Sequence, residues 1–189
     1  MRVIETRLQG LVALEPAIHA DERGFFAETY RSSWHEQLGV PPQEAFVQDN
    51  HSRSEHGVVR GMHFQIGEGV AKLVRCARGR ILDVAVDLRR GSPTYGEWEG
   101  IELDEQTMRE LFVPVGFAHG FCVLSEMADV LYKQTRYYDA QVERGIAWDD
   151  PQVGVRWPLP ADQLTVSARD AQAPTLAEMA DELPFRFEG

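Results

Sequence analysis

Residues 81–87 read ILDVAVD and carry the clearest secondary-structure pattern in the chain. Asp83 and Asp87 stand at odd positions, and the apolar Leu82, Val84 and Val86 stand at the even positions. A period of two places these two sets on opposite faces of a β-strand. The stretch therefore predicts a strand, expected over 81–88, with one apolar face.

Short apolar runs recur along the chain, with Gly and Pro scattered between them. Further strands are expected at 10–15, 24–31, 45–50, 58–65, 72–77, 100–103, 110–114, 120–124 and 130–137. Helical patterns are confined to the ends. Ser33 is expected to cap a short helix that stops at Gly39, and Thr175 to cap a helix over 176–182. The sequence predicts an all-β antiparallel barrel or jelly roll with short helical additions near both ends.

Length and composition indicate one compact unit. The chain has 189 residues, of which 43% are hydrophobic, and no repeat or linker divides it, so we expect a single domain over 1–189. A formal net charge of -11 argues against a nucleic-acid partner, because phosphate-backbone binding needs a broad basic face. A small anionic substrate is compatible with this charge, since a few arginines in a cleft suffice.

The sequence carries no pattern for export or membrane anchoring. Charged residues interrupt the N-terminus at Arg2 and Glu5, and the most apolar stretch, 111–124, is too short to span a bilayer. Cys76 and Cys122 form no Cys-x-x-Cys motif and suit a reducing compartment as buried apolar residues. We therefore expect a cytoplasmic protein with no membrane partner.

Two segments have the outline of the cupin motifs. Residues 57–65 (GVVRGMHFQ), followed by Lys72 and Gly79, resemble the first motif. Residues 114–119 (PVGFAH) match the Pro-x-Gly-x-x-His pattern of the second. The resemblance implies a cupin-like barrel with both segments at one mouth.

The same motifs bear on metal binding. Metal-binding cupins hold a divalent ion with two histidines and a glutamate of the first motif and one histidine of the second. His63 and His119 are present here, but Gln65 and Lys72 stand at the two other positions. Because a cation beside an ammonium group with two good ligands binds poorly, we predict no metal and no other cofactor.

A more specific resemblance is carried by several segments taken together and in order: 21–28, 48–54, 59–65, 71–75, 83–87, 116–121, 132–133, 148–151 and 167–170. Through them the chain resembles the dTDP-4-dehydrorhamnose 3,5-epimerase family over nearly its whole length. The resemblance implies a cofactor-independent isomerase with a dTDP-sugar as its partner. It would invert C3 and C5 of dTDP-4-keto-6-deoxyglucose to give dTDP-4-keto-L-rhamnose.

That chemistry requires three side-chain roles. The C4 carbonyl acidifies the protons on C3 and C5, so inversion needs a base, a stabiliser for the enolate oxygen and an acid on the opposite face. His63 suits the base because imidazole titrates near neutral pH, and by resemblance Asp170 pairs with it. Lys72 suits the enolate, and Tyr132 suits the acid.

Each of these residues has an ordinary structural alternative. Before the motif is considered, His63 is a hydrogen-bonded core histidine, Lys72 a solvated strand residue and Asp170 a turn residue. Tyr137 and Tyr138 compete with Tyr132 as the acid, and periodicity does not separate them. For His119, contact with substrate and structural burial are nearly balanced.

Substrate binding follows partly from chemistry and partly from the resemblance. Arginine forks are natural donors to a diphosphate, and the arginines inside family segments are Arg23, Arg60 and Arg169. The resemblance adds nucleotide and sugar contacts from Phe26, Glu28, Gln48, Asn50, His119 and Tyr138. It also implies a homodimer in which the N-terminal strand with Arg23, Phe26 and Glu28 reaches the neighbouring site.

Three rival interpretations are open. A mono-epimerase acting at C3 or C5 alone would use the same base, lysine and tyrosine. A non-catalytic sugar-binding barrel would have no use for His63, Asp170 and Lys72 together. A metal-dependent cupin is the third, and elemental analysis separates it from the others.

Overall fold

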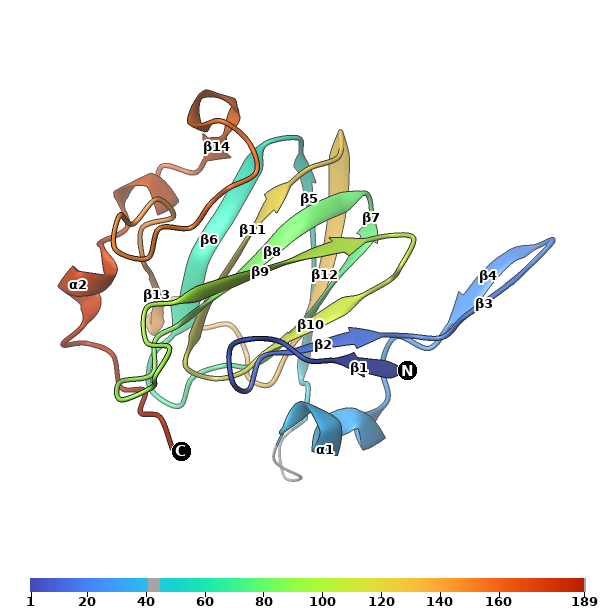
Figure 1. Ribbon diagram of the computed structural model, residues 1–189, viewed down its shortest axis with the longest axis horizontal. Helices are drawn as coiled ribbons and strands as arrows, with labels where there is room; N and C mark the ends of the chain where they lie inside the picture. Colours follow the sequence, from blue (N-terminus) through green and yellow to red (C-terminus); the bar gives the residue numbers. More distant parts are fainter. Residues whose placement is uncertain (41–44, 189) are drawn as a thin grey trace.

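Two sheets lie face to face and form the body of the molecule, as the computed structural model shows for residues 1–40 and 45–188 (Figure 1). The first sheet contains, in spatial order, β1 (Arg2–Ile4), β2 (Val12–Glu15), β10 (Glu110–Val113), β7 (Lys72–Arg78), β12 (Met127–Gln134) and β5 (Gln48–Glu55). The second contains β13 (Glu143–Gly145), β6 (Val58–Gln65), β11 (Phe117–Val123), β8 (Arg80–Asp87) and β9 (Trp98–Asp104), with β14 (Thr165–Val166) beside β6. Among the named strands of the described residues, β14 and β6 are the pair that runs parallel, and an isolated parallel bridge joins Arg90 and Arg186. The prediction of an all-β antiparallel fold is confirmed.

The remaining elements are short. Strands β3 (Ile18–Asp21) and β4 (Gly24–Ala27) form a separate hairpin that projects away from the two sheets (Figure 1). The helical segments are η1 (Ser32–Trp34), α1 (His35–Leu38), η2 (Ala161–Gln163), η3 (Asp170–Gln172) and α2 (Leu176–Met179). No helix within the described residues is long and apolar enough to cross a membrane.

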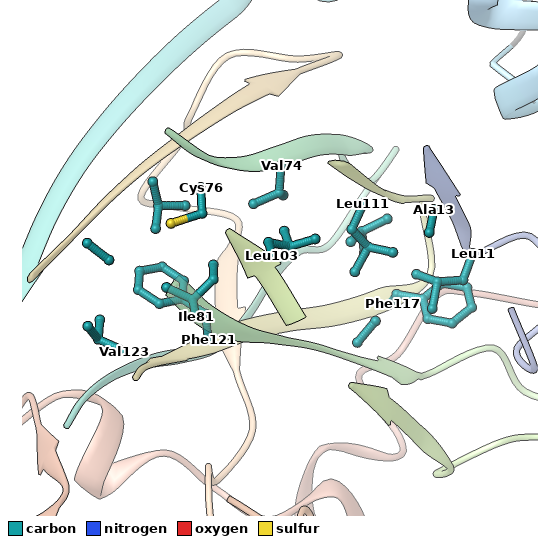
Figure 2. Packing of buried hydrophobic residues seen from close by; sticks show 14 of the residues in the cluster. Leu11, Ala13, Val74, Cys76, Ile81, Leu103, Leu111, Phe117, Phe121 and Val123 are labelled. Atoms are coloured by element: carbon teal, nitrogen blue, oxygen red, sulfur yellow. The ribbon is translucent and has the colours of Figure 1, made fainter. Parts of the chain in front are cut away.

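Apolar side chains from both sheets fill the space between them (Figure 2). Val74 on β7 and Leu111 on β10 belong to the same cluster as Ile81 on β8 and Phe121 on β11, and none of the four is more than 4% exposed. Burial of such a side chain stabilises the fold by about 1.5–3 kcal/mol. This shared core fixes the position of the strands that carry the site.

The stretch at 81–87 forms β8 as predicted, and both of its faces are buried. Leu82, Val84 and Val86 pack in a second apolar cluster. Asp83 and Asp87 are completely buried on the other face. The Asp87 carboxylate accepts hydrogen bonds from the turn that follows β8, so a buried charge there is fully partnered.

The C-terminal segment packs on the second sheet. Leu176, Met179 and Leu183 join Met62 and Phe64 of β6 in the second apolar cluster. Residue His63 lies between these two and therefore points to the other face of β6, where it lines a cavity. The same packing brings the segment around Asp170 to the edge of β6.

Strands β6 and β11 approach closely next to this cavity. His119 is opposite His63 in the register, and the register then shifts, because β6 has two residues (Gly61 and Met62) where β11 has only Gly120 before the Phe121–Arg60 pair. A Cβ atom added at Gly61 would lie 2.5 Å from the Cα of Gly120, and Gly61 has a φ of 128°. Only glycine fits at this crossing.

Some predicted strand boundaries are wrong. The strand expected at 45–50 runs from Gln48 to Glu55, and the strand expected at 130–137 runs from Met127 to Gln134. The sequence of β5 is QDNHSRSE, which contains no apolar residue, so a search for apolar runs misses most of it. Pairing with β12 over its full length defines β5 instead.

The helix predictions were partly right. Gly39 adopts a left-handed conformation and ends α1, as expected. Ser33 is not a cap, because it lies inside the turn that precedes α1 and forms no capping hydrogen bond. Thr175 and Glu178 form the predicted N-terminal cap of α2 as a reciprocal capping box, but α2 ends at Met179.

Candidate active site

A cavity of about 500 Å³ opens between strands of both sheets and the C-terminal segment. Eight of the residues predicted for the site line it: Arg60, His63, Lys72, His119, Tyr132, Tyr138, Arg169 and Asp170. They come from β6, β7, β11 and β12, from the loop between β12 and β13, and from the chain that follows β14. The fold therefore gathers residues that are far apart in the sequence.

His63 and Asp170 form a hydrogen-bonded pair. The Nε2 atom of His63 lies 2.6 Å from the Oδ1 atom of Asp170. The other carboxylate oxygen accepts a hydrogen bond from the backbone N–H of Gly61 at 3.4 Å, and the hydroxyl of Ser167 accepts one from the backbone N–H of Asp170. Burial alone would raise the pKa of Asp170, but the hydrogen bond to His63 and these contacts outweigh it, so the pKa lies below its usual value.

A second histidine–carboxylate pair lies beside the first. The Nε2 atom of His119 is 2.8 Å from the Oδ1 atom of Asp83, and both residues are buried. The Oδ2 atom of Asp83 has no hydrogen-bond partner among the described residues. His119 is therefore a hydrogen-bonded buried histidine, as one of the two alternatives predicted, and it also lines the cavity. Its contact with substrate stays a prediction.

Lys72 and Tyr132 also line the cavity, Lys72 buried and Tyr132 partly buried. Burial lowers the pKa of Lys72 to about 8, and the negative charges of Glu143 and Asp83 oppose this fall. Burial, followed by the charge of Glu143, raises the pKa of Tyr132 above its usual value. At neutral pH both groups carry a proton.

The outer part of the cavity is cationic and aromatic. Arg169 forms an ion pair with Glu143, with 2.5 Å between Nη1 and Oε2, and the Tyr138 hydroxyl donates to the same oxygen at 2.9 Å. Arg60 donates from Nε to the hydroxyl of Ser54. Two guanidinium groups therefore stand where a diphosphate could be bound.

Gln48 and Asn50 lie behind the cavity wall. Gln48 donates to the side chain of Asn50, and Asn50 donates to Gln134, which lines the cavity. The backbone N–H of Tyr138 donates to the side chain of Gln48. These two predicted residues support the cavity but are not among the side chains that line it.

Arg23, Phe26 and Glu28 lie on or next to the β3–β4 hairpin and are not among the residues that line the cavity of their own chain. Arg23 pairs with Asp21, Glu28 pairs with Arg31, and the Phe26 side chain is 70% exposed. The structure does not bring these three residues close to the other ten residues that were predicted for the site.

Several lining residues were not predicted. Gln134 and Ser52 face the cavity, and each follows a predicted residue by two positions, so strand periodicity was the signal that could have found them. Glu143 lies on the three-residue strand β13, where no periodic pattern exists. Ser167 belongs to a family segment but was given no role.

Gln65, at a cupin ligand position, has a structural task. Its side chain accepts a hydrogen bond from the backbone N–H of Asp139 at 2.8 Å and donates to the backbone oxygen of Tyr137. No group of three or more His, Cys, Asp or Glu side chains within 1–40 and 45–188 is placed to hold a metal ion. Independence from metals stays a prediction.

Groups that can take, hold and return a proton meet in one cavity, so the fold and site define an acid–base enzyme on a cupin-like scaffold. The chain belongs to the dTDP-4-dehydrorhamnose 3,5-epimerase family, whose family model matches residues 5–178.

Individual relatives agree with this assignment. A dTDP-4-dehydrorhamnose 3,5-epimerase from Salmonella typhimurium is 49% identical over 178 residues, which cover 93% of this chain and 96% of that protein. The crystal structure of a dTDP-6-deoxy-D-glucose-3,5-epimerase from Legionella pneumophila, in complex with dTDP-4-keto-L-rhamnose, matches with a TM-score of 0.94 and 44% identity, covering 100% of this chain and 99% of that one. This likeness confirms the predicted cupin-like antiparallel fold.

A third relative has a different regiochemistry in its name. A dTDP-4-dehydrorhamnose 3-epimerase from Streptomyces niveus is 41% identical over 183 residues, which cover 96% of this chain and 86% of that protein. The family resemblance inferred from sequence is therefore confirmed, and relatives of one fold include enzymes named for inversion at a single carbon.

Proposed function

We propose that residues 1–189 act as one catalytic domain that converts dTDP-4-keto-6-deoxyglucose into dTDP-4-keto-L-rhamnose by inverting C3 and C5. The observation that carries the proposal is the meeting of the His63–Asp170 pair, Lys72 and Tyr132 in one cavity. Each of the three chemical roles that the reaction requires has a side chain suited to it.

His63 is the base in this proposal. A carboxylate can only accept hydrogen bonds, so an ionised Asp170 requires the hydrogen on Nε2 of His63 and leaves Nδ1 to accept the proton from carbon. The lowered pKa of Asp170 supports its ionised form. After proton abstraction the carboxylate stabilises the imidazolium.

Lys72 and Tyr132 complete the reaction. When carbon loses its proton, negative charge moves to the C4 oxygen, and the buried ammonium of Lys72 stabilises it more strongly than water would. Tyr132 then donates its proton to the opposite face of the same carbon. Burial keeps its phenol protonated, and a carbanion is a much stronger base than a phenolate.

The anchors of the substrate are Arg60 and Arg169 for the diphosphate, with His119 and Tyr138 beside the sugar and base. Gln48 and Asn50 are proposed to reach the nucleotide from β5.

Incubation with dTDP-4-keto-6-deoxyglucose in deuterated water tests this function. The 3,5-epimerase gives deuterium and inverted configuration at both carbons, whereas a mono-epimerase inverts one carbon only. The second outcome is the main alternative, and the 3-epimerase among the relatives is the observation that favours it. A His63→Ala variant should show neither label nor inversion, and a His56→Ala variant, changed at an exposed turn, should match the parent. If the parent leaves both carbons unlabelled, the proposal is wrong.

We also propose that the chain works as a homodimer in which the β3–β4 hairpin completes the neighbouring site. The hairpin projects from the sheets (Figure 1), and Phe25 and Phe26 on it are 62% and 70% exposed. Exposure of two neighbouring aromatic side chains to water is unfavourable in an isolated chain. Arg23 is the cation it would deliver to the substrate.

Subunit mixing tests this arrangement. Arg23→Ala and His63→Ala subunits, each inactive alone, should regain activity when mixed, because a hybrid dimer has one site with both residues intact. A mixture of His63→Ala with Tyr132→Phe is the control, since both changes lie in one cavity and cannot complement each other. Full activity of an isolated monomer would refute the dimer.

The enzyme needs no metal or other cofactor, so exhaustive chelation should leave its turnover unchanged. It acts in the cytoplasm, which agrees with two buried cysteines that do not form a disulfide with each other.

A further inference from the structure

Glu143 is an acidic residue in a cavity that is built for an anionic substrate. It begins β13 and is opposite Gln65 in the register with β6. Its side chain is 13% exposed and lines the cavity. A carboxylate here repels a diphosphate, so its presence requires a reason other than substrate binding.

The contacts of Glu143 supply one part of that reason. One oxygen, Oε2, lies 2.5 Å from Nη1 of Arg169 and accepts the hydroxyl hydrogen of Tyr138 at 2.9 Å. The ion pair raises the pKa of Arg169. One carboxylate thus holds two of the side chains that are proposed to contact the substrate.

Its charge supplies the other part. Lys72 is buried, and desolvation lowers its pKa to about 8, close enough to neutral for a fraction of the ammonium groups to lose their proton. Glu143 is the largest influence that opposes this loss, ahead of Asp83. The same charge also raises the pKa of Tyr132, second to burial.

Other titratable and charged groups lie in or next to the same cavity as Lys72, and they come from several strands and from the loops that follow them. They are Arg60 and His63 on β6, Asp83 on β8, His119 on β11, Tyr132 on β12, and Tyr138, Arg169 and Asp170. Asp83 and Asp170 are each hydrogen-bonded to a histidine, and Glu143 is paired with Arg169.

We propose that Glu143 is a positioning residue of this site: its carboxylate holds Tyr138 and Arg169 at the cavity wall and keeps the Lys72 ammonium charged. The inference rests on the proposed function, in which this ammonium stabilises the enolate. Without Glu143, Lys72 loses its proton at lower pH, and the enolate loses its cationic partner under conditions where the parent retains it.

The composition of the chain makes the test direct. Only two lysines occur in the sequence, Lys72 and Lys133. Protein labelled with carbon-13 at lysine Cε gives two NMR signals, and a Lys72→Met variant assigns them. Lys133 pairs with Asp49 outside this cavity and serves as an internal reference.

In the ligand-free parent we expect the Lys72 signal to titrate near pH 8. In Glu143→Gln, which keeps the size of the side chain and an acceptor for Tyr138, the midpoint should fall by about half a pH unit or more, roughly a threefold change in the ratio of the two protonation states. The Lys133 signal should be the same in the two proteins. Glu143→Asp, which retains the charge, should stay nearer to the parent than Glu143→Gln does.

A matched control lies close by in the fold. Glu182 pairs with Arg144, the residue after Glu143, and its side chain is 60% exposed. Glu182→Gln should leave the Lys72 midpoint unchanged. The inference is overturned if Lys72 titrates at the same pH in the parent and in Glu143→Gln.

The titration is measured without substrate, so it decides the role of Glu143 even if the chain proves to have no epimerase activity. Where activity is present, the alkaline limb of the kcat profile should move to lower pH in Glu143→Gln together with the Lys72 midpoint. A purely structural role for Glu143 would change kcat equally at all pH values. That result, with an unmoved Lys72 midpoint, would contradict the proposal.

Discussion

The Nε2 atom of His63 and the Oδ1 atom of Asp170 lie 2.6 Å apart, although 107 positions separate the two residues in the sequence. Packing of the C-terminal segment on Met62 and Phe64 brings them together, because these residues alternate with His63 along β6. The proposed base and its carboxylate therefore depend on an apolar contact on the opposite face of the strand.

Asp170→Asn should preserve the packing and impair the base. The Asn amide can donate to Nε2, which favours the tautomer with its hydrogen on Nδ1 and leaves no free acceptor for the substrate proton. We predict a fall in kcat of about 100-fold or more, with exchange of solvent deuterium reduced equally. Asp162→Asn, at an exposed turn of the same segment, is the control. If Asp170→Asn exchanged solvent deuterium at the parent rate, the His63–Asp170 pair would not be the base.

Lys72→Met should slow exchange and inversion together. Both outcomes pass through the same enolate, and a thioether of similar length fills the buried position but cannot stabilise negative charge. We predict a loss of about 100-fold or more in the rates of deuterium incorporation and of inversion at each carbon. Lys133→Met removes the other lysine of the chain, which lies outside the cavity, and should have little effect on either rate. A variant that lost inversion but kept full exchange would show that Lys72 acts after the enolate forms.

The buried carboxyl of Glu110 should make the stability of the protein depend on pH. Burial raises the pKa of this carboxyl from 4.5 to about 8, and its Oε1 atom has no hydrogen-bond partner among the described residues. The native state therefore binds more protons than the unfolded state between these two values. Its contribution to stability is fully present below about pH 4.5 and is lost as the pH rises through about 8.

Glu110→Gln removes this titration and keeps the shape of the side chain. At pH 8 the variant should be more stable than the parent by about 1 kcal/mol or more, and the difference should shrink toward pH 5. Urea unfolding at several pH values measures it. An equal difference at all pH values would mean that Glu110 does not titrate in this range.

Sequence patterns located the strands that have one apolar face, and they failed where a strand has none. β8 was predicted almost to the residue because its two faces differ, whereas β5 contains only polar residues and is defined by pairing with β12. The register of a sheet depends on partners far away in the chain, which one sequence does not specify.

The residues of the site also differ in whether the sequence could reveal them. His63 and Lys72 could be predicted from the cupin outline, and Gln134 could have been reached from Tyr132 by a period of two. Glu143 has no local pattern, and its position depends on β13 pairing with the far end of β6. Arg23 pairs with Asp21 of its own chain, and its proposed contact with substrate requires a second chain, which no pattern within one chain describes.

Tyr132→Phe separates proton removal from inversion and is the most informative variant of the site. It deletes the proposed acid and retains a ring that can pack at the same place. His63 can still remove a proton and return a deuteron to the same face. Exchange should therefore outlast inversion, and labelled but uninverted sugar should accumulate.

Two other tyrosines provide the controls. Tyr137 is 72% exposed and is not among the residues that line the cavity, so Tyr137→Phe should match the parent in both exchange and inversion. Tyr138 lines the cavity and donates to Glu143, so Tyr138→Phe should weaken substrate binding more than it changes the ratio of inversion to exchange. The ratio is measured by NMR of the recovered sugar after partial reaction in deuterated water. If Tyr132→Phe inverts C3 and C5 at the parent rate, the proton comes from Tyr138 or from bound water, and Tyr132 is a wall residue of the cavity.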